Sequence, residues 1–208
     1  MNRKTVFFKY RNLCLCFLFC SMYLLSGCAS NAPQEALVQK DGSVIVGHTL
    51  EIKNNDKRLV PLDNKDALAA DGLYYAAWSC GNAKPYENKD GDTVDLYDAQ
   101  LYLLLGEAKS TENAQHDKNT WLAAAEENYD VQQKEEISCN GQSYTLLTYQ
   151  CKSTDTPYDR GVSAFCTHEN TAVCIELTCQ KNFSENLHEM MTGFLNSCFF
   201  INNQSKQI

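Results

Sequence analysis

Residues 184–201 read SENLHEMMTGFLNSCFFI, and the fold expected for this chain depends most on this stretch. Its apolar side chains repeat with the period of an α-helix and form one stripe, which is a pattern typical of core packing. The stripe consists of Leu187, Met190, Met191, Phe194 and Leu195. Ser184 stands where an N-cap residue is expected. Residues 197–201 follow as a strand-like run, so we expect a helix packed on a sheet and leading directly into a final strand.

Two hairpins are predicted upstream of this helix. Residues 131–138 and 142–151 surround Asn140-Gly141. Asn-Gly between strand-like runs favours a type I′ turn, because both residues tolerate a positive φ. Residues 163–167 (SAFCT) and 172–178 (AVCIELT) form the second predicted hairpin.

The alternation of side chains predicts a register for the second hairpin. The residues expected on its core face are Ser163, Phe165, Val173, Ile175 and Leu177. Cys166 then shares the opposite face with Cys174, and the two can lie across from each other. Either a disulfide between Cys166 and Cys174 or two separate thiols fits this register.

The remaining elements are a further helix and several strands. Ser110 or Thr111 can cap a helix whose apolar face carries Trp121, Leu122, Ala125 and Tyr129. Before it, residues 72–79 and 94–105 are predicted as the strands of a long hairpin, and residues 48–52 and 58–62 as short extended segments. Together the elements indicate an α+β fold, with a single domain in which two or three helices pack on an antiparallel sheet.

Between Trp121 and Ile201 the chain resembles the PsbP-like fold group. The resemblance rests on the Asn140-Gly141 hairpin, the paired strands SAFCT and AVCIEL, and the helix SENLHEMMTGFLNS with its abrupt end in the strand SCFFI. The group includes a photosystem extrinsic protein, a nuclear-transport cofactor and several bacterial lipoproteins. The resemblance implies an α+β domain with a binding or assembly role, and it supplies no shared active site.

The N-terminal 27 residues have the three parts of a secretory signal. The positive start consists of Arg3, Lys4, Lys9 and Arg11. Residues 13–25 form an apolar run that is shorter than the roughly 20 residues of a transmembrane helix. Small residues, Ser26 and Gly27, then provide a cleavage site. We expect residues 1–27 to be a signal peptide.

Residues 25–28 read LSGC and resemble the lipobox of bacterial lipoproteins. In that family the Cys thiol receives a diacylglyceryl group, and cleavage then frees an amine that can also be acylated. The resemblance implies cleavage before Cys28 and lipid attachment to Cys28. Two acyl chains suit a stable anchor, because one chain, at ~0.8 kcal/mol per buried CH₂, holds only marginally. An ordinary signal peptide followed by a chance Cys is the alternative.

Residues beyond the cleavage site divide into three parts. Residues 28–45 are polar and without period, so we expect the lipidated Cys and a flexible tether. Residues 46–201 are expected to form the α+β domain, and residues 202–208 a disordered tail. The protein should face outward from the cytoplasmic membrane, or sit on the outer membrane if the host has one, since Ala29 is not the usual retention signal.

The charge of the mature chain excludes one class of partner. The whole chain has 18 Lys and Arg against 26 Asp and Glu, and the four basic residues of the leader are removed, which leaves a formal charge of −12. Such a surface repels phosphate backbones and anionic lipid heads. We expect no nucleic-acid binding, and anchoring by lipid rather than by a basic patch. Solubility is the simplest explanation of the charge.

Seven of the 11 cysteines remain after the leader and Cys28 are set aside. They are Cys80, Cys139, Cys151, Cys166, Cys174, Cys179 and Cys198. An odd number leaves at least one thiol free or paired between chains. No metal site or cofactor is expected, because there is no C-x-x-C pair and no His pair to match Cys174 and Cys179. The histidines His48, His116, His168 and His188 are expected on the surface.

Three functional hypotheses follow. The first is a non-enzymatic surface lipoprotein that binds a membrane complex, a protein partner or an extracellular ligand. The second is an exported hydrolase or thiol-dependent enzyme, for which Cys166 and His168 are the nearest candidates for a nucleophile and its base. As residues i and i+2 of one strand, their side chains are expected about 7 Å apart, which is too far for a hydrogen bond. The third is an accessory role, with aromatics forming either an adhesive face or part of the core. They are Tyr74, Tyr75, Trp78, Tyr86, Tyr97 and Tyr102.

Overall fold

Eight antiparallel strands form the main sheet, in the order β3-β5-β8-β12-β11-β10-β9 with β4 also paired to β5. The structure is a computed structural model that describes residues 38–39, 41–47, 49–62, 68–70, 72–88, 91–152 and 157–201, all within one compact unit. The strands of the main sheet are β3 (Val60–Pro61), β4 (Leu68–Ala70), β5 (Leu73–Cys80), β8 (Ala99–Glu107), β9 (Tyr129–Cys139), β10 (Gln142–Cys151), β11 (Arg160–His168) and β12 (Thr171–Cys179).

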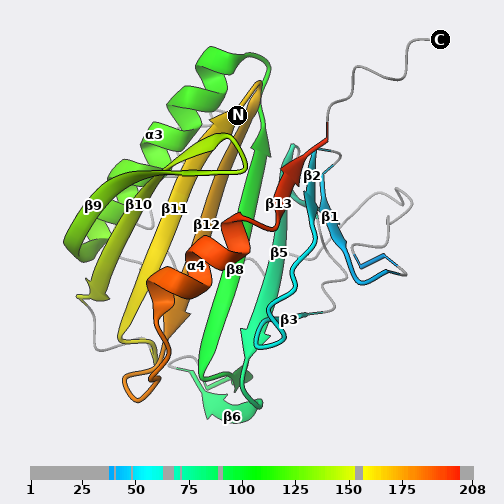
Figure 1. Ribbon diagram of the computed structural model, residues 1–208. Helices are drawn as coiled ribbons and strands as arrows, with labels where there is room; N and C mark the ends of the chain where they lie inside the picture. The colour runs from blue at the N-terminus through cyan, green and yellow to red at the C-terminus, as the bar shows by residue number, and fades with distance from the viewer. Residues whose placement is uncertain are drawn as a thin grey trace. The chain divides into compact units, whose positions relative to one another are not determined.

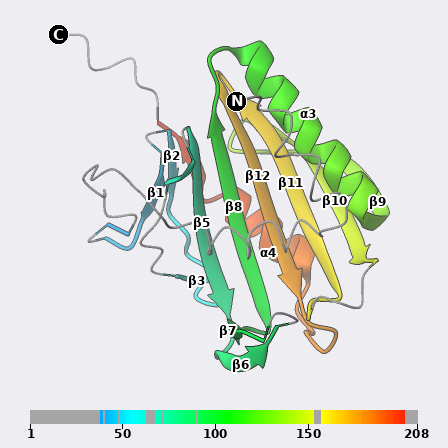
Figure 2. The same cartoon turned by 180° about the vertical axis from the view of Figure 1, so that it is seen from behind.

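The other elements flank this sheet. A three-stranded sheet has the order β1-β2-β13, with β1 at Val44–Val46, β2 at Leu50–Ile52 and β13 at Cys198–Phe200. A small hairpin joins β6 (Lys84–Glu87) to β7 (Thr93–Leu96). The two described helices are α3 (Thr111–Asn128) and α4 (Leu187–Leu195), and they lie against opposite faces of the main sheet (Figures 1 and 2).

The core lies between the main sheet and the layer formed by α4 and the three-stranded sheet. All five residues of the predicted apolar stripe on α4 are buried. Phe194 of this stripe meets Trp78 of β5 edge to face, with ring centroids 4.8 Å apart. Val46, Leu50 and Ile52 of the smaller sheet belong to the same apolar cluster. This burial of apolar surface stabilises the position of β13, which directly follows α4.

The expected antiparallel sheet with packed helices is present, but the described residues are mostly β-structure rather than a balanced α+β mixture. The Asn140-Gly141 turn is confirmed: Asn140 has φ 50° and Gly141 φ 75°, the two positive values of a type I′ turn. The predicted final strand and the helix that begins after Ser110 are also confirmed.

The predicted register of the second hairpin is wrong by one residue. Phe165 lies opposite Cys174, and Cys166 lies opposite Val173. The face packed on the core therefore carries Val162, Ala164 and Cys166 together with Val173, Ile175 and Leu177. Cys166 and Cys174 point to opposite faces of the sheet. Because both faces of β11 and β12 are buried, apolar alternation does not identify the core face, and the two-residue turn sets the register instead.

Two predicted boundaries also need correction. The tether was expected to extend to residue 45, but β1 begins at Val44, and Val38 already forms an antiparallel bridge with Val44. The predicted strand at 94–105 is in fact two strands, β7 and β8. They separate at Asp98, whose backbone N–H donates to the carbonyl of Cys80 and whose carboxylate lies 2.7 Å from Nζ of Lys84.

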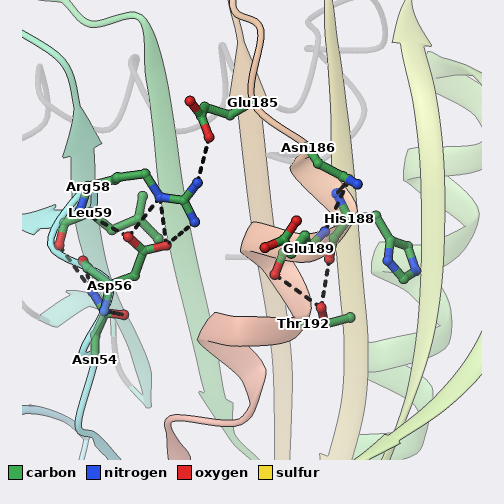
Figure 3. A network of polar contacts seen from close by, with 9 residues as sticks. All are labelled: Asn54, Asp56, Arg58, Leu59, Glu185, Asn186, His188, Glu189 and Thr192. Atoms are coloured by element: carbon green, nitrogen blue, oxygen red, sulfur yellow. Dashed lines mark hydrogen bonds and ion pairs between the residues drawn. The ribbon is translucent and has the colours of Figure 1, made fainter.

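The helix α4 is capped by Asn186 rather than by Ser184. The Asn186 side-chain oxygen accepts hydrogen bonds from the backbone N–H groups of His188 (3.1 Å) and Glu189 (3.2 Å) (Figure 3). Beside this cap, Nη1 of Arg58 lies 2.6 Å from Oε2 of Glu185. Nη2 of the same guanidinium lies 2.7 Å from Oδ2 of Asp56 (Figure 3). The loop after β2 is thereby tied to the segment that leads into α4.

Asn186→Ala is expected to lower the free energy of unfolding by about 1 kcal/mol, because two N–H groups of the first helical turn lose their acceptor. Ser184→Ala is the matched control and should leave stability within about 0.5 kcal/mol of the wild type. Urea unfolding followed by circular dichroism measures both. Equal losses in the two variants would contradict the assignment of the cap.

Candidate functional site

A pocket of about 260 Å³ opens where the β9–β10 turn, the end of β11 and the last strand meet. Figure 1 shows the tip of the β9–β10 hairpin beside the junction of α4 and β13. The pocket is lined by Asn140, Gly141, Gln142, His168, Cys198, Phe199 and Phe200. These residues come from three parts of the chain that are distant in sequence, and the folding of the sheet brings them together.

Asn140 connects the turn to β13. Its Nδ2 donates to the carbonyl of Asn196 at 2.7 Å and to the carbonyl of Cys198 at 3.1 Å. Asn140 adopts the positive φ of the type I′ turn, and its side chain reaches the start of β13. One side of the pocket is therefore held in place by two side-chain hydrogen bonds.

His168, at the end of β11, forms the opposite wall. Its ring stacks on Phe200 with centroids 4.1 Å apart and planes 16° from parallel. Its Nδ1 lies 3.3 Å from Oε1 of Gln142. Gln142 is fixed in turn, because its Nε2 donates to the carbonyls of Ser143 and Thr167 at 3.1 Å each. The imidazole is thus oriented by an amide and covered on one face by a phenyl ring.

The third wall is β13, which also faces solvent. Phe199 is 43% exposed, and Ile201, which follows the strand, is exposed as well. Nζ of Lys53 lies 5.8 Å from the centroid of the Phe199 ring, within the range of a cation–π contact. Small-molecule sites usually enclose about 300–1,000 Å³. A pocket of this size beside one exposed aromatic residue, Phe199, suits a single side chain of a partner better than a whole cofactor.

Cys166 and His168 do not form a catalytic pair. Cys166 is 1% exposed and burial raises its pKa to about 12, so its reactive thiolate form is strongly disfavoured. The Tyr144 hydroxyl is its hydrogen-bond partner. His168 is directed to Gln142 and Phe200 instead. The thiol-enzyme hypothesis therefore finds no support at the residues that suggested it.

Six cysteines of the folded part are free thiols in this structure: Cys80, Cys139, Cys166, Cys174, Cys179 and Cys198. Burial raises the pKa of Cys80, Cys139, Cys174 and Cys198, and it raises the pKa of Cys179 to about 11. Thiols in such surroundings pack as small apolar groups and are poor nucleophiles. Cys198 lines the pocket, but it is almost completely buried and contributes packing there.

The aromatics proposed as an adhesive face are divided between several places. Trp78 is buried in the core, and Tyr74 packs against that core on the same face. Tyr75 and Tyr102 alternate to the other face of the sheet. Tyr86 lies on the β6–β7 hairpin and Tyr97 just after it. They do not form one continuous surface.

A buried polar network that sequence reasoning missed lies on the α3 side of the sheet. Glu176 is 1% exposed, and its Oε1 accepts hydrogen bonds from the Tyr149 hydroxyl (2.7 Å) and the Ser163 hydroxyl (3.3 Å). Tyr149 reaches Glu176 by crossing Gly161, and its ring stacks on Tyr129 with centroids 3.9 Å apart. A buried carboxylate needs such donors, so we assign this network a role in stability.

A second pair of tyrosines extends the polar side of the sheet. The Tyr102 and Tyr158 hydroxyls both donate to Oε1 of Gln100, the former at 2.9 Å. Gln100 pairs with Thr178, which follows Glu176 by two residues on β12. The only signal for this arrangement in the sequence is the placement of polar residues within otherwise apolar strands.

The other predicted features have separate outcomes. His116 is exposed on α3, and Nε2 of His188 lies 3.0 Å from Glu135; His48 is outside the described residues. The signal peptide, Cys28 and the tail at 202–208 are outside them too. Within the described ranges, no His, Cys, Asp and Glu side chains gather as a metal site. In those same ranges, no helix is both long and apolar enough to cross a membrane.

Comparisons with known proteins give only distant likenesses. No protein-family model matches the chain, and no curated protein matches it. The solution structure of cyanobacterial PsbP from Synechocystis sp. PCC 6803 is similar, with 13% identity and a TM-score of 0.38 over 85% of this chain and 99% of that one. A crystal structure from Bacteroides thetaiotaomicron VPI-5482 has 9% identity and a TM-score of 0.28 over 62% of this chain and 46% of that one.

The first of these structures bears the name of the fold group that residues 121–201 resemble. A TM-score of 0.38 is nevertheless too low to carry an argument about this chain.

Proposed function

We propose that this chain is an exported lipoprotein, held on a membrane by lipid attached to Cys28, and that its folded domain binds a partner protein without catalysing a reaction. The observation that carries the binding role is the pocket between the β9–β10 turn and β13. The lipobox-like sequence LSGC at residues 25–28 supports the anchoring role.

Three properties of the pocket support a protein partner. Its walls are held by the hydrogen bonds of Asn140 and Gln142, so it is formed before any partner arrives. Its lining includes Phe199, which is 43% exposed, and exposed aromatic residues are enriched at protein interfaces. Its volume of about 260 Å³ admits one anchoring side chain. A preformed pocket lined by an exposed aromatic residue is what a small docking site requires.

In-cell photo-cross-linking tests this function. A photoreactive amino acid replaces Phe199 in the full-length protein, within the cells that produce it. Val94, an apolar residue of β7 that is 39% exposed, is the matched control position. We expect a protein adduct from position 199 and none from position 94, and we expect His168→Ala to reduce the adduct at 199 because it removes the wall of the pocket. No adduct at 199, or equal adducts at both positions, would overturn the binding role.

A further inference from the structure

The backbone of β13 is oriented so that part of it faces the pocket. The carbonyl of Ser197 accepts from the N–H of Lys53 at 2.9 Å, and the N–H of Ile201 donates to the carbonyl of Thr49 at 2.8 Å. These bonds lie on either side of the Phe199–Glu51 pair. Backbone groups of successive strand residues alternate in direction. Residues 197, 199 and 201 therefore bond to β2, while the backbone groups of Cys198 and Phe200 point the other way, to the side we call the β13 edge.

The β13 edge is only partly covered. The sheet order β1-β2-β13 ends at β13, so no described strand pairs with it on this side. Asn140 Nδ2 occupies the carbonyl of Cys198 at 3.1 Å. The N–H of Cys198 and the N–H and carbonyl of Phe200 point to the same side of β13 as that carbonyl. Residues Cys198–Phe200 also line the pocket.

Three other edges of the described sheets, those of β9, β3 and β1, carry protection that the β13 edge lacks. β9 places Asp130, Lys134, Glu135 and Glu136 along its length. β3 contains Pro61, which has no N–H to offer. β1 is covered by the preceding segment, because Val38 bridges to Val44. Charges, proline and covering segments are the usual means by which proteins stop strands from adding to an edge.

β13 itself reads Cys-Phe-Phe and has neither charge nor proline. From this contrast we infer that the β13 edge accepts an extended segment of the partner as an added strand, with an uncharged residue opposite Phe200 whose side chain enters the pocket beside His168. In strand addition, main-chain hydrogen bonds provide affinity and pockets for alternate side chains provide specificity. The segment's neighbouring side chains would lie toward the outer face, where Phe199 and Ile201 are exposed. This inference rests on the proposed binding function.

The experiment compares two substitutions at one residue. Random heptapeptides displayed on phage are selected on the full-length protein in detergent, and the enriched peptides are then tested on Phe200→Ala and Phe200→Pro. Both variants lack the phenyl ring, but only Phe200→Pro also lacks the N–H that faces the pocket. We expect uncharged, strand-forming peptides that bind Phe200→Pro at least about tenfold more weakly than Phe200→Ala, the effect of losing a main-chain hydrogen bond.

Hydrogen exchange checks that the fold is intact in both variants. The amides of Lys53 and Ile201 report on the β2–β13 ladder, since each donates across it. If Phe200→Pro disturbs these amides, an ester bond in place of the amide between residues 199 and 200, carried by a synthetic segment 198–208 that is ligated at Cys198, removes the same N–H without fixing φ. Native mass spectrometry of the free protein shows whether a second copy occupies the edge instead, which would overturn a partner segment as the occupant.

The outcomes separate the two proposals. Equal binding to Phe200→Ala and Phe200→Pro, or no enriched peptide, would overturn strand addition. If cross-linking at Phe199 still gave its position-specific adduct in that case, the binding function would stand without this mode of binding. Loss of the adduct as well would remove both.

Discussion

Cys28→Ser is expected to abolish lipid labelling of the protein and to leave residues 1–27 attached. A serine hydroxyl is not alkylated under conditions in which a cysteine thiolate is. In the lipoprotein family that LSGC resembles, lipid attachment precedes cleavage, so the variant should accumulate as the precursor. Metabolic labelling with an alkyne palmitate measures the first effect, and the intact mass measures the second. The expected change is complete rather than partial, because one sulfur atom carries the attachment.

Cys20→Ala is the matched control, since Cys20 lies in the apolar run of residues 13–25, which we expect to be removed with the signal peptide. This variant should be labelled and cleaved like the wild type. If the wild type took up no label, and Cys28→Ser were cleaved normally, an ordinary signal peptide followed by a chance Cys would be the correct interpretation. The folded domain would then be secreted without a lipid anchor, and the cross-linking experiment would report on partners of a protein that is not attached to a membrane.

Local patterns in the sequence predicted the elements near the pocket well. The stripe on α4 needs only the helical period, and the Asn140-Gly141 turn needs only two residues that tolerate a positive φ. Both signals lie within one element or one turn. The β13 strand followed from the abrupt change of pattern after Leu195. Elements of this kind can be recognised before any tertiary contact is known.

The predictions that were wrong or missing concern features that depend on contacts between elements distant in sequence. Side chains on both faces of β11 and β12 are buried, one face by the α4 layer, so alternation could not identify the core face. Ser184 and Asn186 are both good caps by residue type, and only the course of the chain before Leu187 places the Asn186 oxygen on the N–H groups of the first turn. The pocket itself joins Asn140, His168 and Phe200, which no spacing rule connects. Long-range pairing is therefore the missing information.

Gly161→Ala is expected to lower the free energy of unfolding by about 1–4 kcal/mol. A methyl group at residue 161 would lie 2.5 Å from Cζ of Tyr149 and 2.7 Å from the backbone oxygen of Leu177. Overpacking of this kind costs about 1–3 kcal/mol. Displacing Tyr149 also removes the shorter of the two hydroxyl hydrogen bonds that the buried Glu176 accepts, and losing one such bond costs about 0.5–1.5 kcal/mol more. The gain of about 0.5–1 kcal/mol that alanine brings over glycine in a strand offsets only part of the sum of these costs.

Thermal unfolding followed by circular dichroism measures this effect, and a fall in Tm of about 10 °C is expected for a domain of this size. Gly193→Ala in α4 is the matched control, because nothing lies within 4 Å of its added methyl group, and it should be neutral or slightly stabilising. Tyr149→Phe removes the hydroxyl without adding volume, so its free energy of unfolding should fall only by the contribution of the Tyr149–Glu176 hydrogen bond. If Gly161→Ala unfolded at the wild-type temperature, the Tyr149 ring could move away without cost, and the Glu176 network would not be the rigid support of the sheet that we assign to it.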